Sequence, residues 1–217
     1  MTRRMRDLPA PRRAEGIIAP AFGRVMTWPY RFGLAGLLRA GLRPWHLTLL
    51  SLVSNVIAGW LLLTGRRLVP AVVLAAAGVL DIFDGGVARA RGEASRWGAF
   101  LDSTLDRVAD VIVFGALFWS LAGQGHRLAA ALALVALVAS FMVSHLRAEA
   151  EAAGIGLTEG VVQRLERYLL LLVGLLVPGA LLPVLAVLAA LGILTAMQRA
   201  WSAWRRVASS PSDPKPT

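Results

Sequence analysis

The chain has 217 residues, of which 57% are hydrophobic and only 17% are charged; it has no cysteine and a formal net charge of +10. So few charged side chains cannot cover the surface of a water-soluble domain of this length, which indicates an integral membrane protein. The absence of cysteine excludes disulfides and thiolate metal sites. The basic residues flank apolar runs without interleaved aromatic residues, which argues against nucleic-acid binding and favours contact with anionic lipid.

The two ends of the chain differ from its apolar middle. Residues 1–20 are basic and show no short apolar core followed by a cleavage site, so they do not resemble a secretory signal peptide. Residues 21–41 mix large apolar side chains with arginines, which predicts an interfacial amphipathic helix rather than a span. Residues 208–217 are rich in Pro and Ser and are expected to be a disordered tail.

Six apolar stretches follow residue 44, each of a length that suits a transmembrane helix of about 20 residues. They are Trp45–Thr64, Leu68–Arg89, Trp97–Leu121, Leu128–Ala150, Val161–Val177 and Leu181–Ala203. The predicted fold is therefore an all-α integral membrane protein with six transmembrane helices preceded by an N-terminal interfacial helix. Residues 21–207 are expected to form one membrane domain, with the spans at 45–203.

The distribution of basic residues predicts the orientation. Of the 23 basic residues, all but Arg66, Arg67 and Arg127 fall on one side of the predicted spans. The positive-inside rule places this side, and both termini with it, in the cytoplasm. We therefore expect a multi-pass protein of the cell membrane. The sequence shows no convincing internal repeat, so an inverted-repeat transporter is not supported.

Four aspartates gather in one short stretch, DIFDGGVARARGEASRWGAFLDSTLDR, which begins at position 81. Asp81 and Asp84 lie near the end of one predicted span, whereas Asp102 and Asp106 lie near the start of the next. Their i, i+3 and i, i+4 spacings put each pair on one helix face. An antiparallel helix pair can bring both faces together, where four ionised carboxylates would repel one another. An all-oxygen site of this kind suits Mg²⁺ or Mn²⁺.

Small and basic residues accompany the aspartates. Gly85, Gly86 and Gly98 have no side chain, so they permit close approach of a helix or of a bulky ligand. Arg89, one turn after Gly85, can bind a phosphate through its guanidinium. Acidic groups, bare backbone and an arginine together indicate a site for a diphosphate.

Two other roles are known for aspartates in membrane helices, a structural or proton-carrying role and a divalent-cation pathway. A transporter would need polar residues across the whole membrane. Here the helices become apolar beyond the acids, as VVLAAAGVL at 72–80 and VIVFGALFW at 111–119. An enzyme open at one end is therefore favoured over a divalent-cation transporter.

The aspartate stretch satisfies the pattern DxxDGxxARx(8)GxxxDxxxD at every fixed position, namely Asp81, Asp84, Gly85, Ala88, Arg89, Gly98, Asp102 and Asp106. This pattern resembles the signature of the CDP-alcohol phosphotransferases. Six spans after an amphipathic helix are similar to that family as well. The resemblance implies a membrane enzyme of phospholipid biosynthesis that transfers a phosphatidyl group from CDP-diacylglycerol, or a similar CDP-lipid, to a polar alcohol and releases CMP.

The same resemblance implies roles for individual residues. Two Mg²⁺ (or Mn²⁺) ions would be held by Asp81, Asp84, Asp102 and Asp106, with Asp106 also the general base for the attacking hydroxyl. The implied contacts with the CDP-lipid are Trp45, His46, Leu47, Thr48, Gly85, Arg89 and Ser95. Helix capping is an alternative role for Thr48 and Ser95. A homodimer is expected by analogy with the family.

Two stretches outside the signature, VSHLRAEAEAAGI (143–155) and QRLER (163–167), resemble the actinobacterial phosphatidylinositol phosphate synthases. This resemblance implies inositol phosphate as the acceptor. The expected acceptor-binding residues are Arg147, Arg164, Arg167 and Arg199. Glu149 departs from the pattern, since those synthases carry an arginine there. Glycerol 3-phosphate, the acceptor of phosphatidylglycerolphosphate synthases, stays open, as does a merely solvated helix end at 147–151.

Overall fold

The computed structural model describes residues 8–9, 19–156 and 164–209, and within these ranges helices joined by short turns are the only regular secondary structure. The seven helices of the described part are α1 (Ala19–Arg39), α2 (Pro44–Leu63), α3 (Leu68–Arg91), α4 (Arg96–Gly123), α5 (Arg127–Ala152), α6 (Arg164–Leu176) and α7 (Leu181–Ser209). The prediction of an all-helical chain is confirmed. The expected basic segment at 1–20 and the expected tail at 208–217 lie mostly outside the described residues.

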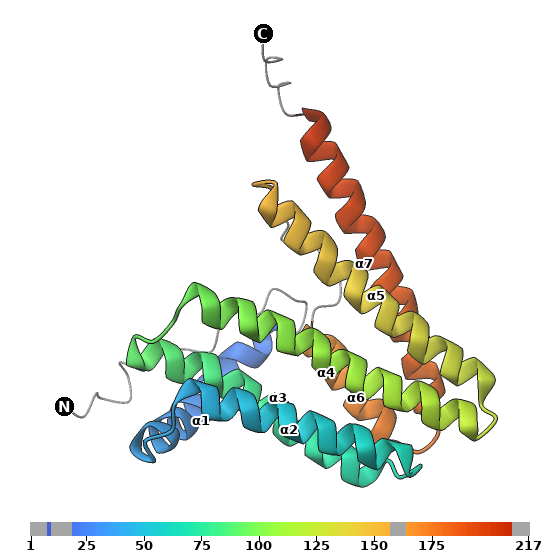
Figure 1. Ribbon diagram of the computed structural model, residues 1–217, viewed down its shortest axis with the longest axis horizontal. Coiled ribbons are helices and arrows are strands. Elements are labelled where there is room, and N and C mark those ends of the chain that lie inside the picture. The colour runs from blue at the N-terminus through green and yellow to red at the C-terminus, as the bar shows by residue number, and fades with distance from the viewer. Residues whose placement is uncertain (1–7, 10–18, 157–163, 210–217) are drawn as a thin grey trace.

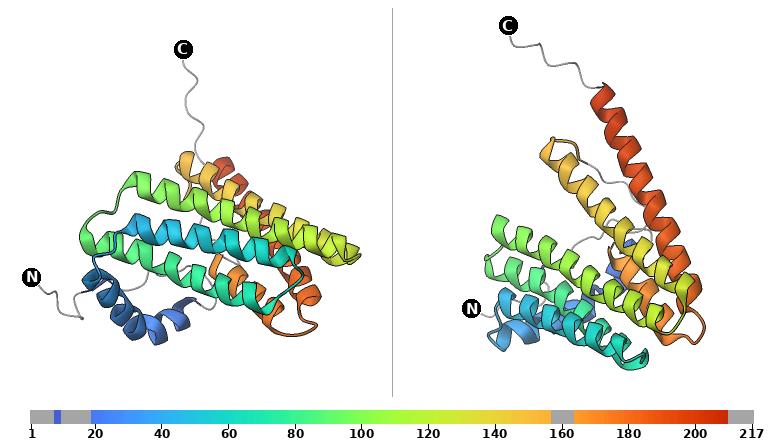
Figure 2. Two further views of the ribbon diagram at one scale, coloured as in Figure 1. Left: turned by 60° about the horizontal axis from the view of Figure 1, so that its bottom comes forward. Right: turned by 45° about the vertical axis from the view of Figure 1, so that its right-hand side comes forward.

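The helices pack as two groups. Helices α2, α3 and α4 run side by side, whereas α5 and α7 form a pair that leans away from them (Figures 1 and 2). The two groups are joined by the packing of α4 against α5 and by α6, which packs against both α3 and α7. One buried apolar core extends through the six helices α2 to α7, with Leu62, Leu74, Leu117, Ala133, Leu171 and Leu185 among its members.

Small residues bring α5 and α7 together. Ala129, Ala133 and Ala136 recur at helical spacing on the buried face of α5. On α7, a Cβ added to Gly192 would lie only 2.8 Å from the Cβ of Ala139. Apolar side chains gain little by exchanging lipid for protein, so helices in a membrane associate through such close backbone packing.

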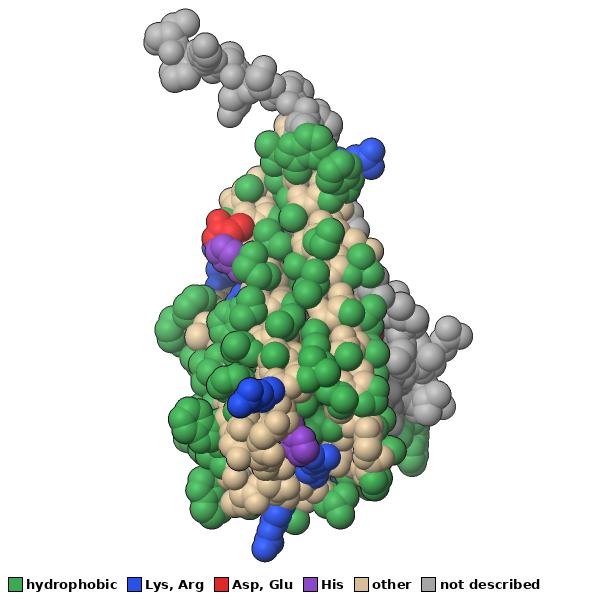
Figure 3. All heavy atoms as spheres, turned by 90° about the vertical axis from the view of Figure 1, so that its right-hand side faces the viewer, with side chains coloured by type: hydrophobic (Ala, Val, Ile, Leu, Met, Phe, Trp, Pro, Cys, Tyr) green, Lys and Arg blue, Asp and Glu red, His purple; other side chains and the backbone are tan. Residues whose placement is uncertain are grey.

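The outer surface of the bundle is largely apolar, as Figure 3 shows for one face. Trp60, Val72 and Trp119 are 66%, 64% and 71% exposed. A water-soluble protein rarely exposes apolar surface so extensively. Helices α2, α3, α5 and α7 are each long and apolar enough to cross a membrane, which supports the prediction of a membrane protein.

Two of the six expected spans differ from these four. Helix α4 has 28 residues, but Asp102, Asp106, Arg107 and Asp110 place charge in its first half. Helix α6 has 13 residues, and the first part of the expected span, at 161–163, lies outside the described residues. Among the described residues, length and composition alone therefore identify four spans.

Helix α1 packs across α3 through a small apolar cluster of its own. Tyr30 and Leu34 are buried in this cluster together with Leu47 of α2 and Val87 of α3. The contact is close because Gly86 has no side chain. A Cβ at this position would overlap the Tyr30 hydroxyl.

A short turn between α3 and α4 is defined by local sequence signals. Gly92 adopts φ 71°, a left-handed conformation that favours glycine. Its N–H donates to the Arg89 carbonyl, and the Glu93 N–H donates to the Ala88 carbonyl at 2.9 Å. These two bonds form a Schellman motif. Ser95 then caps α4, because its hydroxyl accepts from the Gly98 N–H at 3.0 Å.

Substitution of Gly86 by Ala should destabilise the docking of α1. Overpacking of a filled site typically costs about 1–3 kcal/mol, more than the roughly 1 kcal/mol that Ala gains over Gly in a helix. We expect the thermal unfolding midpoint of Gly86→Ala in detergent to fall by several degrees.

Two further variants isolate the cause. Gly36→Ala on α1 is the matched control, because a Cβ at that position meets nothing within 4 Å. Tyr30→Phe combined with Gly86→Ala removes the hydroxyl that clashes, so it should recover part of the loss. An unchanged midpoint in Gly86→Ala would contradict the close contact.

Candidate active site

The turn between α3 and α4 brings the four aspartates to matching depths. Asp84 lies seven residues before the end of α3, and Asp102 lies six residues after the start of α4. At about 1.5 Å per residue, both are roughly 10 Å from the turn. Asp81 and Asp106 each lie ten residues from the ends of their helices, or about 15 Å.

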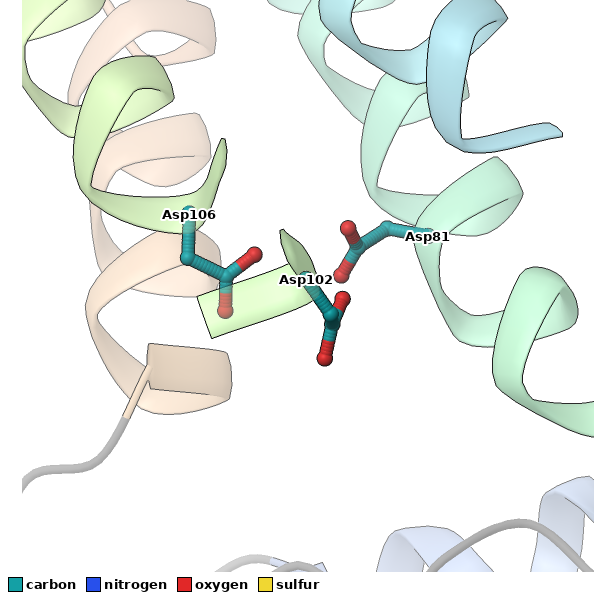
Figure 4. Close-up of side chains that lie close together, drawn as sticks. All are labelled: Asp81, Asp102 and Asp106. Carbon is teal, nitrogen blue, oxygen red and sulfur yellow. The ribbon is translucent and has the colours of Figure 1, made fainter. Parts of the chain in front are cut away.

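Three of the four predicted carboxylates meet. Asp81 of α3 and Asp102 and Asp106 of α4 point toward one another (Figure 4), and one oxygen of each lies within 4.8 Å of the others. Two ionised carboxylates at 4.8 Å repel by about 3 kcal/mol if the effective dielectric constant is about 20. Three convergent carboxylate oxygens are a donor set that fits a hard divalent cation.

Asp84 is not part of this group of three. Its side chain is buried, 6% exposed, and its Oδ2 lies 2.8 Å from the hydroxyl of Thr48 on α2. The same hydroxyl lies 3.1 Å from the Pro44 carbonyl, a bond within its own helix. The structure thus places Thr48, one of the predicted CDP-lipid contacts, directly against a predicted metal ligand.

Arg89, Gly85 and Tyr30 form one side of the site. The Arg89 guanidinium folds back over Gly85, where an added Cβ would lie 3.3 Å from its Nη1. The Tyr30 ring stacks on Phe83 with 5.1 Å between ring centroids. Burial raises the pKa of Tyr30, although the nearby Arg89 opposes this rise. The sequence analysis missed Tyr30, and the only signal for it was the extra glycine, Gly86, beside the signature.

The other predicted CDP-lipid contacts lie around the start of α2 and the start of α4. Trp45 is 56% exposed and its ring is tilted against that of His46, whose Nδ1 accepts from the Arg43 N–H at 3.1 Å. The Leu47 side chain packs in the α1 cluster. Ser95 has the capping role that was its alternative, so its role in ligand binding stays a prediction.

The end of α5 gathers guanidinium groups from three helices. Arg199 of α7 is buried and donates to the Val143 carbonyl at 2.8 Å. Arg107 of α4 donates to the Ser144 carbonyl at 3.4 Å. Arg147, one turn further along α5, pairs with Glu151 at 3.0 Å. Two of the predicted acceptor residues, Arg147 and Arg199, are thus near one another in the fold.

Arg167, a third predicted acceptor residue, is held in a partly buried polar contact. Its guanidinium lies 3.3 Å from Asp110 of α4 and donates to the Ser140 hydroxyl of α5. Asp110, one turn beyond Asp106, is thus paired with Arg167 and is outside the three-carboxylate group. The side chain of Arg164 lies outside the described residues.

Comparison with known proteins agrees with this geometry. The family model for CDP-alcohol phosphatidyltransferase matches residues 42–204. The phosphatidylinositol phosphate synthase of Mycobacterium marinum is 36% identical over 179 residues, which are 78% of this chain and 76% of that protein. The archaetidylinositol phosphate synthase of Methanothermobacter thermautotrophicus is 38% identical over 150 residues, 66% of this chain and 74% of that protein.

Solved structures give the same result. The crystal structure of the Mycobacterium tuberculosis phosphatidylinositol phosphate synthase with CDP-DAG bound is similar with a TM-score of 0.74 and 33% identity, and the match covers 85% of this chain and 96% of that chain. A second structure of that enzyme, in complex with manganese and citrate, has the same TM-score of 0.74 and covers 84% and 91%. The resemblance seen in the aspartate signature therefore extends through the whole membrane bundle, and the chain belongs to the CDP-alcohol phosphatidyltransferase family.

Proposed function

We propose that this protein transfers the phosphatidyl group of CDP-diacylglycerol to a hydroxyl of inositol phosphate and releases CMP. The proposal rests on one observation. Carboxylate oxygens of Asp81, Asp102 and Asp106 lie within 4.8 Å of one another at one end of an apolar bundle. The relatives support both substrates, since one is solved with CDP-DAG bound and several are phosphatidylinositol phosphate synthases.

Two divalent ions, Mg²⁺ or Mn²⁺, are part of this proposal. Asp81, Asp102 and Asp106 would hold them, with Asp84 as the fourth ligand from beside Thr48. The complex of a solved relative with manganese supports this assignment. When bound, such ions offset the repulsion between the carboxylates and stabilise the negative charge that develops on the diphosphate oxygens.

Other steps of the reaction, namely binding of the diphosphate and removal of the hydroxyl proton, are assigned to side chains and backbone of the protein. Arg89 and the bare backbone at Gly85 bind the diphosphate, because a guanidinium pairs well with phosphate oxygens. Asp106 accepts the proton of the acceptor hydroxyl while that oxygen forms the new phosphate ester bond and the bond to CMP breaks. An aspartate is a weak base, so the hydroxyl must be held close to it.

The acceptor phosphate would bind near the end of α5. Arg147 and Arg199 lie there, and Arg167 is fixed by Asp110 and Ser140 on the neighbouring helices. The departure at Glu149 does not oppose this arrangement. Its side chain is 69% exposed and lies 3.8 Å from His145, so water screens its charge from a bound phosphate.

The membrane arrangement that we propose has six spans within the domain 21–207, with α4 and α6 joining the four helices that meet the length and composition criterion. The charged half of α4 then lies at the cytoplasmic interface, in the cell membrane, with both termini in the cytoplasm. Helix α1 lies in this interface, since Trp28 and Phe32 stack on each other while remaining 72% and 62% exposed.

We also propose a homodimer. Gly115 and Gly123 of α4 have nothing within 4 Å of an added Cβ, so the described part of the chain leaves room for a partner helix there. Small residues of this kind allow close packing between membrane helices.

Removal of divalent ions should abolish CMP release from CDP-diacylglycerol, because the convergent carboxylates then lack the charge that neutralises them. Addition of Mg²⁺ or Mn²⁺ should restore it. The measurement is CMP release by the purified protein with inositol phosphate as acceptor. Release that continues after complete chelation would contradict the proposed metal site.

The Asp106→Asn variant should lose about 10²–10⁴-fold in turnover, which is the usual contribution of a general base. Asn keeps the shape of the side chain and one ligand oxygen, so binding of CDP-diacylglycerol should largely persist. Asp110→Asn is the matched control, one turn away and outside the three-carboxylate group. At saturating acceptor, it should retain most of its turnover. A normal rate in Asp106→Asn would remove the assignment of the base.

The Arg147→Gln variant should raise the KM for inositol phosphate at least tenfold, and the KM for CDP-diacylglycerol much less. The reason is the loss of a charge-assisted hydrogen bond to one substrate only, worth about 1.5–3 kcal/mol. Arg205→Gln is the control, because Arg205 is exposed and stacks over Trp201 on α7. If both variants change the two KM values equally, Arg147 is not an acceptor residue.

A further inference from the structure

A cavity of about 570 Å³, which is broadly open to the surface rather than enclosed, lies at the end of the bundle opposite the aspartates. Asp106 and the end of α4 at Gly123 are 17 residues apart, which is about 25 Å along a helix. This cavity is therefore separate from the site described above. Its volume falls within the range of about 300–1,000 Å³ that is usual for small-molecule sites.

The polar lining of this cavity is basic. Arg67 comes from the turn between α2 and α3, whereas His126 and Arg127 come from the turn between α4 and α5. These turns, and the one at 177–180 that also lines the cavity, contain no Asp or Glu. Figure 3 looks onto this end of the molecule, and in the lower part of the view basic and His side chains stand apart from the acidic ones, which lie higher up beside another His. Within the described ranges, none of the three side chains makes a hydrogen bond or ion pair.

The backbone adds to this positive potential. Helix α3 begins directly after Arg67 and α5 begins directly after His126, and neither helix start has a side-chain cap. The first N–H groups of a helix lack acceptors within the helix and carry partial positive charge. Of these N–H groups, that of Arg127 already donates to the Gly125 carbonyl at 2.9 Å. The other helix-start donors and the three unpaired basic side chains at one cavity favour an anion with several acceptor oxygens.

The remaining lining is apolar and continuous with the surface that faces lipid. Leu121 and Leu181 form the buried part of the cavity wall, and Leu128 and Leu182 are 65% and 44% exposed. A small soluble anion would make no favourable apolar contact with these leucines. A phospholipid would place its phosphate among the cations and its acyl chains along the apolar helices.

We propose that this cavity binds the phosphate of an anionic phospholipid, which the reaction at the aspartates does not consume. The cavity is lined by the turns that join α2 to α3, α4 to α5 and α6 to α7. One bound phosphate thus connects all three turns at this end of the bundle, and its occupancy stabilises the folded protein by mass action.

The test uses the full chain, purified in detergent and titrated with phosphatidylglycerol or phosphatidylcholine. Bound lipid is counted by native mass spectrometry, and the thermal unfolding midpoint is followed in parallel. Phosphatidylglycerol should bind at least tenfold more tightly than phosphatidylcholine and should raise the midpoint. Arg67→Gln combined with Arg127→Gln should weaken phosphatidylglycerol binding at least tenfold. Arg66→Gln is the matched control, since Arg66 is adjacent in sequence but does not line the cavity, and its binding should be unchanged.

Several results would overturn the proposal. Equal weakening by Arg66→Gln would mean that diffuse surface charge holds the lipid. Equal binding of both lipids would remove the phosphate specificity, and displacement by inorganic phosphate at the lipid's own concentration would identify a soluble anion as the ligand. CDP-diacylglycerol binding checks that the double variant is folded. If it is not, Arg127→Gln and His126→Gln are titrated singly, and unweakened binding in both is equally contradictory.

Discussion

Repulsion between like charges at the edge of a membrane is the constraint on which this structure depends. Asp81, Asp102 and Asp106 lie within 4.8 Å of one another on two different helices, so their separation is stable only if both helices are fixed relative to each other. The turn that ends at Ser95 and begins with the left-handed Gly92 provides this, because it sets where α3 stops and α4 starts. Packing of α2 against both helices then holds their faces together.

The distribution of charged and apolar side chains along the helices is consistent with charges confined to the membrane boundary. Charged side chains occupy the two ends of the bundle, while the helices between them bury small residues and expose large apolar ones. A reaction between a lipid-linked diphosphate and a polar alcohol requires such a boundary, because one substrate stays in the bilayer and the other arrives from water. The aspartates lie about two to three turns from the helix ends, where both substrates can reach them.

Local signals made much of this predictable from the sequence. The expected span Trp45–Thr64 agrees with α2 to within one residue at each end. The agreement is close because a proline marks the start of the helix and a glycine follows its end. The helical spacings likewise indicated that aspartates of α3 and α4 would converge, which holds for Asp81, Asp102 and Asp106, whereas Asp84 contacts Thr48 of α2 instead. By contrast, the contact of Tyr30 with Gly86 and the pairing of Asp110 with Arg167 join residues far apart in the chain. Tertiary packing decides such contacts, and no local pattern encodes them.

The apolar interior is divided into two clusters, and α1 belongs only to the smaller one. A helix that shares few contacts with the main core can detach while that core stays intact. Its backbone amides should therefore exchange with solvent through a local fluctuation, at a lower free energy than unfolding of the bundle. Since Tyr30 packs against Gly86 on the helix that carries Asp84 and Arg89, each such opening should loosen the packing around these two residues. The stability of the site therefore depends on how tightly α1 packs in this smaller cluster.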